Sequence, residues 1–157
     1  MNKKILIFSF FITILISGCG YKIINYSENI NFKINEISSK GEKRINYKIK
    51  NKLLSMSNDK STNLITLKIS SNKEKNVKER NLKNEITKYK IDIKVEVEFY
   101  ELSKNISKKF NVNGSGDYNV NKQHSQTISN EKSLIETLSD DLTERIINQL
   151  ISRMNAN

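Results

Sequence analysis

The sequence predicts a single α+β domain in which two helices pack on one face of a four-stranded, mixed, mostly antiparallel sheet. Alternating apolar residues predict strands at about 30–37, 63–71 and 88–100, and a less regular fourth strand follows them. Apolar residues at helical spacing predict helices at 42–56 and 131–154. The resulting order is β-α-β-β-β-α, so the first helix connects two parallel strands by a right-handed crossover. The last three strands are expected to form an antiparallel meander.

The strand at 88–100 shows the clearest alternation in the chain. Its odd-numbered residues, from Tyr89 to Phe99, are apolar, and its even-numbered residues are mostly charged. A strand of this kind belongs to an antiparallel sheet that is covered on one face only. The next strand, around 106–112, alternates less regularly, and the two glycines within 114–118 predict a bend near its end.

Each predicted helix has an apolar face and a predicted start. Ser39 and Glu42 have the spacing of a capping box at the start of the first helix. The closing helix, 131–154, carries Leu or Ile every four residues, and Ser129 or Asn130 can cap its start.

Two polar stretches separate these elements. Residues 72–84 are rich in Lys, Glu and Asn, with Val77 and Leu82 as their apolar residues. This composition predicts a solvated hairpin arm between the second and third strands, into which strand pairing could extend. Residues 119–130 predict a polar loop that holds the only histidine, His124, which we expect to be solvated.

The chain begins with a secretory signal. Lys3 and Lys4 precede a run of twelve mostly apolar residues, 5–16, which is shorter than the roughly 20 residues that a transmembrane helix needs. Residues 16–19, Ile-Ser-Gly-Cys, resemble the bacterial lipobox. That resemblance implies cleavage before Cys19, a diacylglycerol group on its sulfur, and an acyl chain such as palmitate on the freed amine. The alternative is a free thiol beside an ordinary signal.

These features divide the chain into a lipoprotein signal peptide (1–18), a lipidated tether (19–29) and one domain (30–157). Stable anchoring takes about two hydrophobic signals, which this modification exceeds. Since Cys19 is the only cysteine, no disulfide can form within the chain. We therefore predict a protein that is anchored to a membrane and does not span it.

The formal net charge is +10, or about +8 once Lys3 and Lys4 are removed with the signal. This balance favours anionic partners such as phosphate-bearing lipids and anionic glycans, and export argues against nucleic acid. Lysine, however, outnumbers arginine 23 to 4, and Asn and Ile are abundant. An AT-rich coding bias produces the same pattern without any ligand.

No group of residues predicts catalysis or a metal site. The chain has one His and one Cys, its carboxylates are scattered among lysines, and Asp140 and Asp141 are expected to be solvated. Its glycine pair lacks the spacing of a phosphate-binding loop. We therefore predict that the protein is not an enzyme and carries no cofactor other than the covalent lipid on Cys19.

The lipobox, the size and the element order together resemble the lipopolysaccharide-assembly lipoprotein family, LptE type. The resemblance is carried by Cys19-Gly20-Tyr21, by 47–54 in the first helix, by the strand 87–100 and by the closing helix, 134–153. It implies a lipoprotein that plugs the outer-membrane β-barrel lipopolysaccharide translocon in a 1:1 complex, supports barrel assembly, and helps insert lipopolysaccharide into the outer leaflet. It also implies a periplasm-facing position on the outer membrane of a Gram-negative bacterium, with which Gly20 is compatible.

Basic residues in and beside the predicted arm are the candidates for binding lipid A phosphates, because Lys and Arg can replace divalent cations there. They are Lys73, Lys75, Lys78, Arg80, Lys83, Lys88 and Lys90. A second hypothesis is a structural or auxiliary lipoprotein of a different envelope transporter. A third, a small substrate-binding lipoprotein, is disfavoured because the 139 residues after the signal give no two-lobed cleft.

Overall fold

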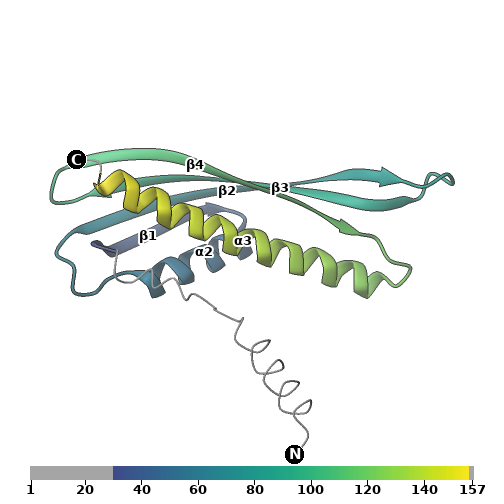
Figure 1. The fold of residues 1–157 in the computed structure, drawn as a ribbon, viewed down its shortest axis with the longest axis horizontal. Helices are drawn as coiled ribbons and strands as arrows, with labels where there is room; N and C mark the ends of the chain where they lie inside the picture. Colours follow the sequence, from purple (N-terminus) through teal and green to yellow (C-terminus); the bar gives the residue numbers. More distant parts are fainter. Residues whose placement is uncertain (1–29, 156–157) are drawn as a thin grey trace, which may run out of the picture.

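The computed structural model describes residues 30–155. In chain order they form β1 (Lys33–Gly41), α2 (Lys43–Met56), β2 (Leu64–Arg80), β3 (Ile86–Glu101), β4 (Ile106–Asn119) and α3 (His124–Asn155). The strands lie in sequence order in one sheet, with β1 parallel to β2 and the other pairs antiparallel. Both helices cover one face of this sheet (Figure 1), which confirms the predicted fold class. The predicted signal peptide and tether lie outside the described residues.

The hydrophobic core fills the space between the sheet and the two helices. Alternation places every second residue of β2 and β3 on the helix-facing side, and their neighbours face solvent, as the sequence predicts. The central core side chains are at most 2% exposed: Ile65, Leu67, Ile69, Ile91, Ile93, Val95, Val97 and Phe99 from the sheet, and Ile45, Ile49, Leu53, Leu142, Ile146, Ile147 and Leu150 from the helices.

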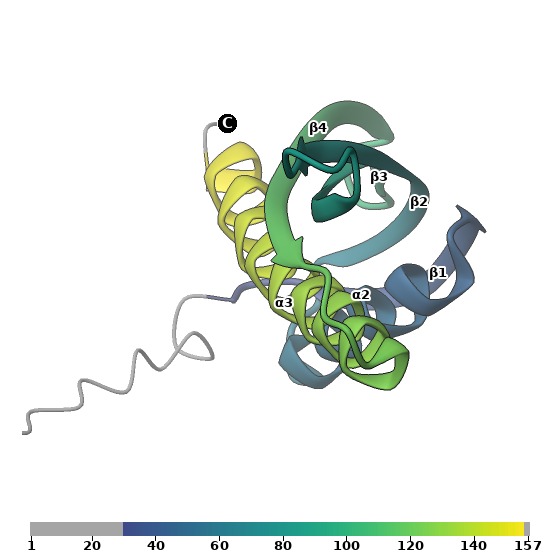
Figure 2. The same cartoon turned by 90° about the vertical axis from the view of Figure 1, so that its right-hand side faces the viewer.

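The sheet is strongly coiled (Figure 2), and the tip of the β2–β3 hairpin extends past the helices at one end of the molecule (Figure 1). Toward this tip β2 and β3 remain paired from Lys73 opposite Ile93, which is still in the core, to Arg80 opposite Ile86. We call residues 73–93 the arm. Its tip lies at the opposite end of the molecule from residue 30 and from the end of α3 (Figure 1). The predicted hairpin arm is therefore present, but it is paired strand as far as Arg80.

The predicted bend at 114–118 is wrong, because β4 continues as one strand through both glycines to Asn119. A Cβ atom on Gly114 would lie 3.3 Å from Leu142 Cγ, and one on Gly116 would lie 2.6 Å from Leu134 Cδ1. The two glycines therefore let α3 pack close to β4 and do not turn the chain.

The predicted polar loop at 119–130 is also wrong in its second half, because α3 begins at His124. These first turns lack an apolar stripe but are held by polar contacts. Asn130 Nδ2 donates to the Asn119 carbonyl at 3.1 Å, and Asn121 N donates to Thr127 Oγ1 at 2.9 Å. His124 is the exposed first residue of the helix, and Ser129 and Asn130 lie inside it and cap nothing.

The predicted capping box is wrong as well. Ser39 belongs to β1, which starts later than predicted and continues to Gly41, and it lies opposite Ile69 of β2. Glu42 is the N-cap residue of α2 but makes no side-chain capping hydrogen bond. Its carboxylate lies 3.9 Å from Lys73 Nζ instead, so pairing to β2 replaces the local contact that the sequence suggested.

Candidate functional site

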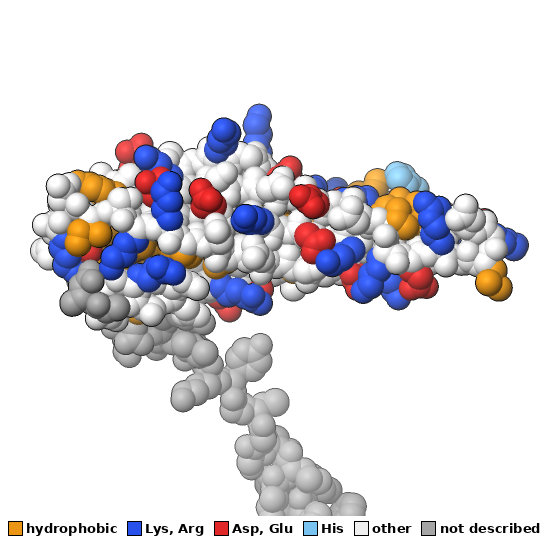
Figure 3. All heavy atoms as spheres, turned by 90° about the horizontal axis from the view of Figure 1, so that it is seen from above, with side chains coloured by type: hydrophobic (Ala, Val, Ile, Leu, Met, Phe, Trp, Pro, Cys, Tyr) orange, Lys and Arg blue, Asp and Glu red, His pale blue; other side chains and the backbone are white. Residues whose placement is uncertain are grey.

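The structure brings all seven predicted lipopolysaccharide-binding residues into the arm. Lys73, Lys75, Lys78 and Arg80 lie on β2, Lys83 lies in the turn, and Lys88 and Lys90 lie on β3. Acidic side chains are interspersed with these basic ones along the molecule (Figure 3). The partners of each cation decide which of them remain available to a ligand.

Lys75 lies in a cluster with two tyrosines and a glutamate, which we call the Lys75 cluster (Lys75, Tyr89, Tyr118 and Glu131). Lys75 Nζ lies 2.7 Å from Glu131 Oε2, which also accepts a 2.8 Å hydrogen bond from Tyr118 OH. The ammonium lies 4.3 Å from the Tyr89 ring centroid, and the two tyrosine rings stack at 5.7 Å. This cluster joins the arm to β4 and to α3.

Burial and hydrogen bonding act in opposite directions on the charged groups of this cluster. Burial acts to lower the pKa of Lys75, but hydrogen bonds to Glu131 and Tyr118 outweigh it and raise that pKa. Burial acts to raise the pKa of Glu131, and the hydrogen bonds from Lys75 and Tyr118 outweigh it and hold that pKa below its usual value. Both groups are therefore held in their charged forms at neutral pH.

Four further cations of the arm are paired with carboxylates. Lys78 pairs with Asp117, Lys88 with Glu79 at 3.0 Å, Lys90 with Asp92 at 2.8 Å, and Lys73 with Glu42 at 3.9 Å. The hydrogen bond from Lys88 lowers the pKa of Glu79, and the one from Lys90 lowers the pKa of Asp92. These pairs are solvent-accessible, so each contributes little to stability, and a stronger anion can compete for the same lysine.

The tip of the arm, residues 80–84, differs from the rest of the arm, which we call its stem. Arg80 Nη1 donates to the Asn84 carbonyl at 2.9 Å, and within the part of the chain that the structure describes no carboxylate pairs with Arg80 or Lys83. Leu82, between them, is fully exposed, and Asn84 has a φ of 63° that forms the tight turn. The tip therefore presents two cations and one apolar side chain.

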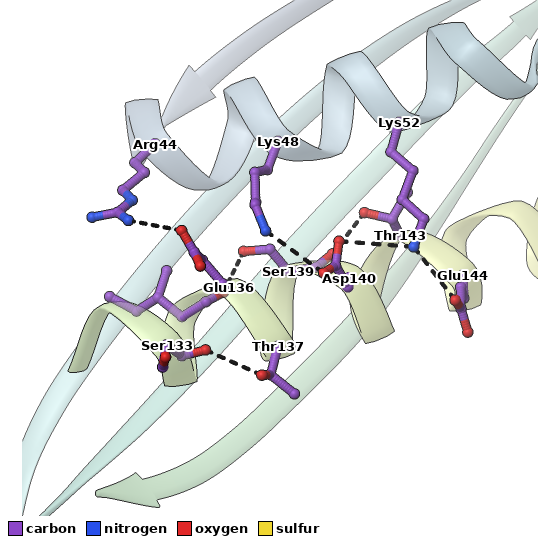
Figure 4. Close-up of polar contacts among 11 residues, drawn as sticks. Arg44, Lys48, Lys52, Ser133, Glu136, Thr137, Ser139, Asp140, Thr143 and Glu144 are labelled. Carbon is purple, nitrogen blue, oxygen red and sulfur yellow. Dashed lines mark hydrogen bonds and ion pairs between the residues drawn. The ribbon is translucent and has the colours of Figure 1, made fainter. Parts of the chain in front are cut away.

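The sequence did not predict the partners of these cations. Glu131 and Asp117 are far from the arm in sequence, on α3 and β4, and no local pattern marks them. Asp140 is exposed, as expected, and it also pairs with Lys48 at 3.6 Å and Lys52 at 3.8 Å on α2 (Figure 4). Arg44–Glu136 and Lys52–Glu144 extend this row of ion pairs between the two helices.

The uncovered face of the sheet carries three open hollows of about 360, 330 and 290 Å³. Polar side chains line most of them, including Asn72, Asp92 and Asn113 in the first, and Lys68 and Glu98 in both of the others. Across residues 30–155, no group of His, Cys, Asp and Glu is arranged to hold a metal ion. No helix in this range is long and apolar enough to span a membrane.

No protein-family model and no curated protein matches the sequence. Three solved bacterial lipoproteins share the fold. The rare lipoprotein B of Shewanella oneidensis matches with a TM-score of 0.59 and 14% identity over 76% of this chain and 96% of that one. A Caulobacter crescentus lipoprotein matches with a TM-score of 0.57 and 14% identity over 77% of this chain and 92% of that one. Lipoprotein B of Nitrosomonas europaea matches at 0.56 and 13% identity, over 81% of this chain and 87% of that one.

Proposed function

We propose that this protein is the lipoprotein subunit of an outer-membrane lipopolysaccharide translocon, a non-enzymatic plug that supports the β-barrel and helps insert lipopolysaccharide. The observation that carries the proposal is the fold shared with rare lipoprotein B, which extends over 96% of that protein. The Cys19 lipobox supports it independently, because it directs the chain to the same class of lipid-anchored protein.

The arm supplies chemistry for lipid A. Lipid A carries phosphates and acyl chains, and the tip presents Arg80 and Lys83 around an exposed Leu82. Arg can bind a phosphate through two parallel N–H groups, and Lys adds a point charge. The paired lysines of the stem, such as Lys88 and Lys90, can exchange their exposed carboxylate partners for phosphate. The lipopolysaccharide site therefore centres on the tip.

Affinity purification of the full-length lipidated protein from its native envelope tests the proposal. Recovery of a large outer-membrane β-barrel protein in a 1:1 ratio is the expected result. Recovery of an inner-membrane transporter in its place would overturn the proposal and favour the second hypothesis, an auxiliary lipoprotein of another envelope transporter. Cys19→Ala gives a matched control, because it carries the same domain without the lipid.

The arm can be tested separately by binding of purified lipopolysaccharide. Arg80→Ser with Lys83→Ser removes the two predicted cations of the arm that lack a carboxylate partner and leaves the Lys75 cluster intact. Loss of two charge-assisted contacts is expected to weaken binding by about tenfold or more. Lys60→Ser with Lys68→Ser removes the same charge outside the arm and is expected to change binding little. Equal effects of the two pairs would show that overall charge, and not the tip, binds lipopolysaccharide.

A further inference from the structure

The exposed surface of α2 has two sides of different character. Arg44, Lys48 and Lys52 point toward α3 and pair with its carboxylates (Figure 4). Lys43, Tyr47, Lys50 and Leu54 recur at helical spacing on another side of the helix, away from these pairs and from the core-facing residues. We call these four residues the α2 stripe.

The α2 stripe combines apolar and cationic side chains that the domain itself does not use. Tyr47 is 69% exposed and Leu54 is 42% exposed. Within residues 30–155 neither Lys43 nor Lys50 pairs with a carboxylate, whereas the three cations facing α3 all do. Aromatic and Leu side chains beside unpaired lysines are typical of helices that lie on membrane surfaces. Lysines near an anionic leaflet are attracted to it.

The position of the tether brings a membrane to this end of the domain. Asn58, which follows α2, donates from Nδ2 to the Ile30 carbonyl at 2.9 Å and from its backbone N to the Phe32 carbonyl at 3.1 Å. The chain therefore enters the domain beside the end of α2. Only residues 20–29 separate Cys19 from Ile30, and a chain of this length spans at most about 35 Å.

We propose that the α2 stripe rests on the anionic lipid surface of the leaflet that holds the Cys19 lipid, so that the α2 side of the free lipoprotein faces the membrane. A stripe of four residues binds weakly on its own. The tether makes the contact intramolecular, and a high effective concentration compensates for weak affinity. This inference rests on the lipid anchor and does not depend on the translocon.

Tryptophan fluorescence tests the proposal, because the chain contains no Trp. Tyr47→Trp places a single reporter in the α2 stripe, and Leu82→Trp places one at the arm tip, which is fully exposed and lies at the opposite end of the domain from its first described residues. The full-length lipidated variants are reconstituted into vesicles of phosphatidylethanolamine and phosphatidylglycerol that contain a brominated phospholipid. The reporter in the Y47W variant is expected to lie at the depth of the headgroups. Its fluorescence is therefore expected to be quenched about threefold more strongly than that of the L82W variant, and to be emitted at shorter wavelength.

Charge removal provides the second part of the test. In the Y47W background, Lys43→Gln with Lys50→Gln is expected to reduce the quenching by about half, as is a rise in salt concentration, because both weaken attraction to the leaflet. Lys122→Gln, in the connection before α3, with Lys132→Gln, in the N-terminal part of α3, removes equal charge away from α2 and is expected to have no effect. Equal quenching in Y47W and L82W would overturn the proposal while leaving the anchor and the translocon subunit standing. Failure of the protein to float with the vesicles would overturn it together with the anchor.

Discussion

Gly41 and Ser71 approach so closely that a Cβ atom on Gly41 would lie 1.9 Å from the Ser71 carbonyl oxygen. Gly41 ends β1 with a φ of +99°, a region that other residues rarely adopt. The next residue, Glu42, donates its backbone N–H to Ser71, with Ser71 Oγ at 3.0 Å and the Ser71 carbonyl at 3.4 Å. This contact closes the parallel pairing of β1 with β2 and sets the start of α2.

Gly41→Ala is therefore expected to destabilise the fold by about 3 kcal/mol, since it adds both a backbone clash and a strained φ. The free energy of unfolding, measured by urea denaturation, checks this value. Gly116→Ala is the matched control, because the three atoms nearest its new Cβ all belong to the Leu134 side chain, which can move, and none is backbone. A loss of about 1 kcal/mol is expected there. Equal losses at the two positions would contradict the role assigned to Gly41.

The sequence predicted the core well because burial on one face leaves a regular trace. The alternation from Tyr89 to Phe99 identified the helix-facing side of β3, and the repeat of Leu and Ile identified the buried side of α3 as far back as Leu134. In both elements the same physical cause, contact with one apolar layer, acts on every second or every fourth residue.

The remaining elements could not be predicted because contacts distant in sequence determine them. The first turns of α3 have no apolar repeat and are held by Asn119 and Asn121, which precede the helix. The glycines of β4 have the sequence signature of a turn, but in the structure they leave room for Leu142 and Leu134 of α3 to pack against the strand. The lysines of the arm were predicted as ligand-binding residues, but Glu131 and Asp117, which pair with two of them, carried no local signal.

The Lys75 cluster predicts an acid-dependent loss of stability. Glu131 has a lower pKa in the folded protein than in the unfolded chain. Its contribution is therefore fully present above the unfolded pKa of about 4.3 and is lost as the pH falls through the folded pKa. Glu131→Gln is expected to lower stability by about 1 kcal/mol at pH 7, and the difference from the unchanged protein is expected to shrink on acidification below about pH 4.5.

Urea unfolding at several pH values measures this convergence. Glu136→Gln is a suitable control, because this glutamate is also on α3 and pairs with Arg44 on the more exposed surface. Its substitution is expected to change stability by less than about 0.5 kcal/mol. A difference between the E131Q variant and the unchanged protein that stays constant from pH 7 to pH 3 would show that Glu131 contributes through packing and not through its charge.

The ion pairs between α2 and α3 are expected to be weak individually. Lys52 Nζ lies 3.8 Å from Asp140 and 3.4 Å from Glu144, and all three side chains are partly exposed. A double-mutant cycle with Lys52→Ala and Asp140→Ala is expected to give a coupling energy of about 0.5 kcal/mol. In about 1 M salt the coupling is expected to disappear, because screening at that concentration acts over about 3 Å. A coupling that persists in high salt would indicate a contact through the lysine stem.

The proposed lipidation requires the sulfur atom of Cys19. Cys19 is the only cysteine in the chain, so Cys19→Ala removes the only thiol that can form a thioether to a diacylglycerol group. The variant is expected to incorporate no labelled palmitate. It is also expected to be absent from the membrane fraction that detergent extracts, because the acyl chains supply the anchoring free energy at about 0.8 kcal/mol per buried CH₂. Ser17→Ala keeps a small residue in the lipobox and is expected to be labelled normally. Palmitate incorporation into the C19A variant would show that the lipid is attached elsewhere or that residues 16–19 are not a lipobox.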